Sequence, residues 1–81
     1  MDDEKILILD YNENPFQNLL CNFEMIEFLS LNHCNLKSLN EMPFFPNLYK
    51  LELNYNAIED FSPLSQYLYL SQLSILGSSS T

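Results

Sequence analysis

Two adjacent residues, His33 and Cys34, could supply catalytic chemistry, because an imidazole base beside a thiol can activate it as a nucleophile. Neighbouring residues at the end of a strand point in different directions, however, and Cys34 stands where the repeat pattern described below expects a buried residue. We therefore interpret Cys34 as a structural cysteine and do not expect an enzyme. A thiol enzyme that uses Cys34 and His33 is the alternative.

The sequence lacks the residue patterns that metal binding and phosphate binding require. The sequence has neither a Cys-x-x-Cys nor a His-x-x-x-His pattern to bind zinc, so no metal site is expected. Gly77 is the single glycine, which excludes a glycine-rich phosphate loop, and no cofactor is expected. The hydroxyl groups of residues 78–81 could accept phosphate, although a terminal run of hydroxyls is weak evidence.

Side chains suited to holding a protein partner are more numerous. Aromatic and polar residues recur at one offset along the chain and would form a contact ledge beside a sheet. Alternatively, the tyrosines only cover a turn, and Phe28 only packs against Ile6 of the preceding unit. The predicted partner-binding residues are Asp10, Tyr11, Phe28, Ser30, Asn32, His33, Lys50, Glu52, Asn54, Tyr55, Gln72 and Ser74.

Composition narrows the class of partner. The chain has 81 residues, a net charge of −8 and only three Lys and Arg residues, so we expect no direct contact with nucleic acid. The charge is compatible with a basic protein partner, or it only keeps the surface soluble. The sequence contains no apolar run long enough to cross a membrane, and two cysteines are too few for a disulfide scaffold, which favours a reducing compartment.

An internal repeat positions these residues. Apolar side chains recur at intervals of 22 residues, in ladders that include Leu7, Leu29, Leu51 and Leu73, then Leu9, Leu31, Leu53 and Ile75, and also Leu20, Met42 and Leu64. Residues 26–36 and 48–58 fit the leucine-rich-repeat consensus at every fixed position. The first copy is degenerate, because Glu4 and Asn14 replace apolar residues.

The consensus implies a local structure for each unit. The Leu-x-Leu pair forms a short strand whose leucines point inward while the residue between them points outward. Asn12, Cys34 and Asn56 follow at the turn, where a buried Asn amide, or more weakly a thiol, would bond backbone groups of the neighbouring repeat. Later apolar residues such as Leu39 and Phe45 lie on the return segment. Prolines 43, 46 and 63 favour short helical or extended pieces there.

We therefore predict an α/β fold: a right-handed leucine-rich-repeat solenoid with a curved parallel β-sheet on its concave face and short helical or irregular convex segments. The predicted domain spans residues 1–81. Its parts are a capping unit 1–25, repeats 26–47 and 48–69, the start of a further repeat at 70–78, and a tail at 79–81. Asp2, Asp3 and Glu4 either cap the solenoid or form a frayed end. Lacking a C-terminal cap, the chain is expected to be part of a longer protein and to self-associate through its edge strand.

Two segments carry a family resemblance. Residues 27–39, E-F-L-S-L-N-H-C-N-L-K-S-L, and residues 46–58, P-N-L-Y-K-L-E-L-N-Y-N-A-I, resemble the acidic leucine-rich nuclear phosphoproteins, as does the opening L-I-L-D at residues 7–10. The resemblance covers about residues 5–78. It implies a non-enzymatic adaptor of nucleus and cytoplasm that binds histones and inhibits a protein phosphatase. The family's long acidic tail is missing from this sequence.

Similar 22-residue units occur in two other protein classes. One is the A-prime protein of the U2 spliceosomal particle, whose partner is an RNA-binding domain, and the other is a nuclear regulator of protein phosphatase 1. The alternatives to a histone-binding protein are therefore a spliceosomal scaffold and a phosphatase-regulatory leucine-rich-repeat protein.

Overall fold

Four short strands begin 22 residues apart, and the return segments between them are almost entirely irregular. The computed structural model describes residues 4–77. The strands are β1 (Ile6–Ile8), β2 (Phe28–Ser30), β3 (Lys50–Glu52) and β4 (Gln72–Ser74). One 3-10 helix, η1 (Ser62–Gln66), lies in the return segment before β4 and has a proline in its first turn, as expected for Pro63.

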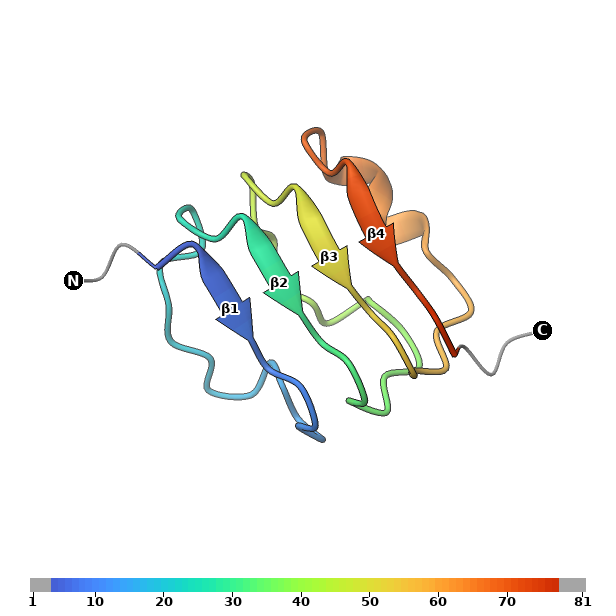
Figure 1. The fold of residues 1–81 in the computed structure, drawn as a ribbon. Helices are drawn as coiled ribbons and strands as arrows, with labels where there is room; N and C mark the ends of the chain where they lie inside the picture. The colour runs from blue at the N-terminus through green and yellow to red at the C-terminus, as the bar shows by residue number, and fades with distance from the viewer. Residues whose placement is uncertain (1–3, 78–81) are drawn as a thin grey trace.

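The strands form one parallel sheet in the order β1-β2-β3-β4, so the chain is a small α/β-type domain (Figure 1). Each strand pairs with the next without a register shift: Leu7 lies opposite Leu29, Leu29 opposite Leu51, and Leu51 opposite Leu73. The interval of the sequence repeat is therefore also the interval of the strand pairing. Figure 1 shows the return segments together behind the sheet, which leaves its other face uncovered.

The core lies between the sheet and the return segments. Leu29 and Leu51 are fully buried, and Phe45 and Leu39 cover them from the return side as predicted. Burial of one leucine contributes about 1.5–3 kcal/mol, so these apolar ladders are the main source of stability. At the β4 edge of the described residues the ladder opens to solvent, and Leu73 is 44% exposed.

The turn after each strand contains the expected polar residue. Asn56 is buried, and its Oδ1 accepts the backbone N–H groups of Cys34 and Leu36, both at 3.0 Å. Its Nδ2 donates to the carbonyl of Leu31 at 2.8 Å. The predicted role of Asn56 in joining neighbouring repeats is therefore confirmed.

Two expectations for the first unit are wrong. Asn12 is exposed, and its Oδ1 accepts only the local N–H of Asn14, because no earlier strand supplies backbone groups for it to bond in the described residues. Leu20 shares an offset with Met42 and Leu64 but is 93% exposed, whereas the preceding Leu19 is partly buried and packs against the core. The predictions for Asp2, Asp3, Ser78 and the tail at 79–81 concern residues outside the described range.

Candidate protein-binding face

The uncovered side of the sheet, called the front face below, consists of the outward residues of the four strands and the residues that directly follow them. Just beyond the C-terminal ends of β1, β2 and β3, the residues Asp10, Asn32 and Asn54 form a polar ladder across the front face. In each of these residues Oδ1 accepts a backbone N–H one repeat later: Asp10 from Asn32 at 2.9 Å, Asn32 from Asn54 at 2.8 Å, and Asn54 from Leu76 at 2.7 Å. The ladder therefore fixes the spacing of the strand ends and the orientation of its own side chains.

Two further side chains join the polar ladder. The Ser30 hydroxyl donates to Asp10 Oδ1 at 2.6 Å, and Asn32 Nδ2 donates to Ser30 Oγ and to Glu52 Oε1, both at 3.0 Å. These neighbours cover Ser30, which is only 3% exposed. The Ser30 hydroxyl is therefore enclosed and already bonded in the chain itself. Its role is to position the carboxylate of Asp10.

The side chains directly after the ladder form an aromatic row: Tyr11, His33 and Tyr55. The His33 ring is stacked between the two tyrosine rings, with centroids 4.6 Å from Tyr11 and 4.4 Å from Tyr55. All three residues have a positive φ near 60°, a strained conformation for side chains of this size. Since the ring faces contact each other, the row mainly offers its edges and the tyrosine hydroxyls to a partner.

Gly77 takes the fourth position of this row, also with a positive φ of 67°. A Cβ atom at Gly77 would lie 2.3 Å from Cδ1 of Tyr55, so the Tyr55 ring packs directly over the glycine. The position requires glycine both for its backbone angle and for the space that the ring occupies.

The N-terminal half of the front face is apolar. Ile6 and Ile8 on β1 are 55% and 62% exposed, and Phe28 lies beside them on β2, half-buried. The Lys50 ammonium lies 4.9 Å from the centre of the Phe28 ring, a cation–π contact. Solvent-exposed isoleucines next to an aromatic ring are typical of an interaction surface.

The front face becomes more polar toward β4. Gln72 is exposed there, next to Lys50 in the register, and Ser74 donates its hydroxyl to Asn54 Oδ1 at 2.8 Å. Of the predicted contact residues, the structure therefore brings eleven to an accessible or partly accessible surface on the front face or its rim, and encloses Ser30. Ile6 and Ile8 were not among the predicted contact residues, although their alternation with Leu7 and Leu9 in the sequence predicts that they point outward.

The possible catalytic pair is not arranged as a nucleophile and its base. Cys34 is 1% exposed, and its Sγ donates to the carbonyl of Leu9 at 3.1 Å. Burial raises the pKa of the Cys34 thiol, the opposite of what an activated cysteine needs. The His33 ring is stacked between Tyr11 and Tyr55. The burial of Cys34 and its bond to Leu9 are typical of a structural cysteine.

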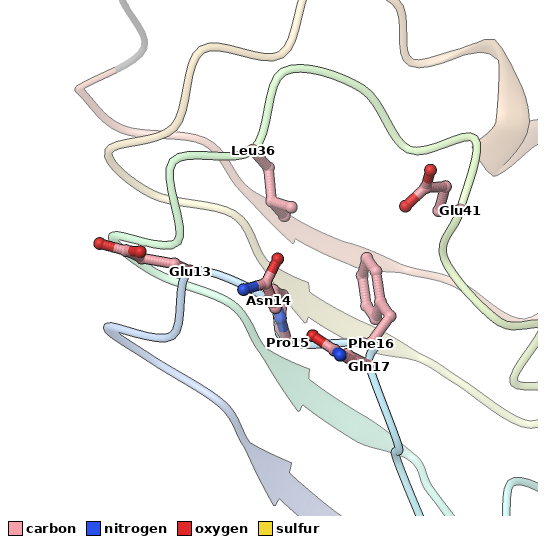
Figure 2. Close-up of a pocket in the computed structure, with 7 residues that line it drawn as sticks. All are labelled: Glu13, Asn14, Pro15, Phe16, Gln17, Leu36 and Glu41. Atoms are coloured by element: carbon pink, nitrogen blue, oxygen red, sulfur yellow. The ribbon is translucent and has the colours of Figure 1, made fainter.

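A hollow of about 390 Å³ lies away from the front face, between the first two return segments (Figure 2). Half-buried Phe16 and Leu36 and buried Pro15 line it. Figure 2 shows its two carboxylates, Glu13 and Glu41, on opposite sides of the hollow.

Neither a metal-binding cluster nor a membrane-spanning helix occurs in the described residues. Residues 4–77 contain no group of three metal-binding side chains, and none of their helices has the length and hydropathy to cross a membrane. No family model matches the chain, and searches of curated proteins and of solved structures give no significant match.

Proposed function

We propose that this chain is a leucine-rich-repeat solenoid module that binds a basic protein partner through its front face. The observation that carries the proposal is the composition of the front face: exposed Ile6 and Ile8 share it with the carboxylates of Asp10 and Glu52, which hydrogen bonds hold in place. Side chains that are already ordered lose little entropy when a partner binds, which favours recognition.

The leucine-rich-repeat part of the proposal is supported by the 22-residue pairing register and by the bonds of buried Asn56 to the previous repeat. Parallel strands that stack one repeat on the next are typical of such solenoids. The resemblance of residues 27–39 and 46–58 to the acidic nuclear phosphoproteins favours histones, or a protein phosphatase, as the partner in nucleus and cytoplasm.

A binding assay with purified core histones tests the proposal. We expect binding that weakens when NaCl rises from roughly 50 mM to roughly 300 mM, because salt screens the charges. The double variant Asp10→Asn/Glu52→Gln removes two negative charges but keeps the hydrogen-bond acceptors of the ladder. It should therefore weaken binding without disturbing the fold. The control Glu59→Gln/Asp60→Asn changes the net charge equally at exposed residues off the front face and should bind like the unchanged chain.

Two outcomes would oppose the proposal. Equal weakening by both double variants would show that only the overall charge attracts histones, and the front face would lose its role. Binding of a purified spliceosomal RNA-binding domain, with no histone binding, would favour the spliceosomal scaffold instead.

A further inference from the structure

The front face combines an apolar surface and an acidic surface whose relative position is fixed by the strand register. Ile8 pairs with Ser30 and Ser30 with Glu52 across the sheet, while Asp10 follows Ile8 by two residues along the chain. Two residues of an extended strand span about 7 Å, and two strand spacings span about 10 Å. A single short segment can therefore contact Ile8 and reach both carboxylates.

The apolar part of this surface is exposed to solvent. Ile8 is 62% exposed and Ile6 is 55% exposed, whereas Leu7 between them on β1 is partly buried and packs against the core. Phe28 adds a ring to the surface, and a shallow hollow of about 300 Å³ beside Ile6 and Phe28 continues it. An aliphatic side chain placed here would remove apolar surface from water on both partners.

The two carboxylates of the acidic surface are oriented by uncharged hydrogen-bond donors. Asp10 Oδ1 accepts from the Ser30 hydroxyl and the Asn32 N–H, while Asp10 Oδ2 has only a long contact of 3.5 Å to the Asn32 amide. Glu52 is bonded through Oε1. Each carboxylate therefore keeps an oxygen with unused acceptor capacity, so charge complementarity requires a cationic group on the partner.

We infer that the front face recognises a short extended segment with an aliphatic residue followed, two positions later, by Lys or Arg. The aliphatic side chain lies on Ile6, Ile8 and Phe28, and the cationic side chain lies between Asp10 and Glu52. In an extended segment, residues two positions apart point to the same side, which matches the separation of the two surfaces. This inference rests on the proposed function, because it names the chemistry that the binding face selects.

Titration of the isotope-labelled chain with synthetic peptides, followed by NMR of the backbone amides, tests this recognition. The probe contains two Leu-Ser-Arg motifs in a Gly-Ser background. We expect it to shift the amide signals of Ile8, Asp10 and Phe28 with an affinity in the millimolar range, as for a small weak contact. Three matched peptides replace Arg by Glu, replace Leu by Ala, or place Leu and Arg side by side, and all should bind more weakly.

Variants of the chain complete the test. Asp10→Asn should weaken binding of the Leu-Ser-Arg peptide about threefold and Ile8→Thr about fourfold. Glu59→Gln and Leu68→Thr, at exposed residues off the front face, should leave binding unchanged. Thermal melting of each variant verifies that it is folded.

Each contrary result overturns a stated part of the inference. Equal or tighter binding of the Glu peptide refutes the cationic requirement, and equal binding of the Ala peptide refutes the aliphatic anchor. Shifts confined to residues away from the front face refute the site. If histones still bind at the front face while the Leu-Ser-Arg peptide does not, this inference fails and the proposed function stands; if histone binding is also independent of that face, both fail.

Discussion

Replacement of Asn56 by alanine is expected to destabilise the fold more than any surface change. The Asn56 side chain is 5% exposed and bonds three backbone groups of the preceding repeat: the N–H of Cys34, the N–H of Leu36 and the carbonyl of Leu31. Alanine can replace none of these bonds. Its methyl group would leave two buried backbone groups and the partly buried N–H of Leu36 without a partner.

The magnitude follows from the cost of such groups. Each unsatisfied buried donor or acceptor costs about 1–3 kcal/mol, and entry of water would recover part of that cost. We therefore expect Asn56→Ala to lower the free energy of unfolding by about 3–5 kcal/mol. A domain of this length has a total stability of about 4–12 kcal/mol, so the variant should lose at least about a quarter of that stability.

Urea denaturation followed by far-ultraviolet circular dichroism measures this loss. The matched control is Asn12→Ala, the same position in the first unit, where the exposed side chain bonds only the N–H of Asn14 at 3.0 Å. We expect the control to cost less than about 1 kcal/mol. A loss below about 1 kcal/mol for Asn56→Ala, or equal losses for the two variants, would refute the account of how neighbouring repeats are joined.

Three further predictions concern the core, a titrating tyrosine and the cysteines. Leu51→Ala should cost about 2–5 kcal/mol in urea denaturation because Leu51 is fully buried, whereas Leu68→Ala, at an 85% exposed residue, should cost almost nothing; similar costs would contradict the assigned core. Burial raises the pKa of Tyr67 above its ordinary value of 10.0, so the unfolded state ionises first and stability should fall as the pH rises from about 10 through the raised pKa. Thermal melting should show a smaller fall for Tyr67→Phe, and an unchanged pH profile in that variant would assign the fall to other groups. A thiol reagent should label half-buried Cys21 in the native state but Cys34 only after denaturant is added, and rapid native labelling of Cys34 would contradict its burial.

The strand register could be predicted from the sequence because apolar spacing and strand pairing share one period. Leu29 and Leu51 lie opposite each other because each is the first leucine of the Leu-x-Leu pair in its own repeat. The predictions that failed depend on neighbours that the repeat does not specify. Asn12 is exposed because the described residues contain no earlier strand for its amide to bond, and Leu20 is exposed while Leu19 beside it packs against the core.

The candidate site was predicted as a row of positions but not as a network of bonds. Strand alternation placed Asp10, Asn32 and Asn54 on the outward face, and their common offset was visible in the sequence. Their bonds to the next strand were not, because side-chain rotamers depend on the packed structure. For the same reason the burial of Ser30 under its neighbours could be found only in three dimensions.

The central claim is that the front face binds the partner. The most direct test is a map of the residues that core histones contact on this chain, measured by NMR cross-saturation of its backbone amides. The account predicts that the affected amides cluster on β1, β2 and β3 around Ile8, Asp10 and Glu52, and that Asp10→Asn/Glu52→Gln weakens the effect. Saturation confined to the return segments, such as residues 36–47, would contradict the claim that the front face binds the partner.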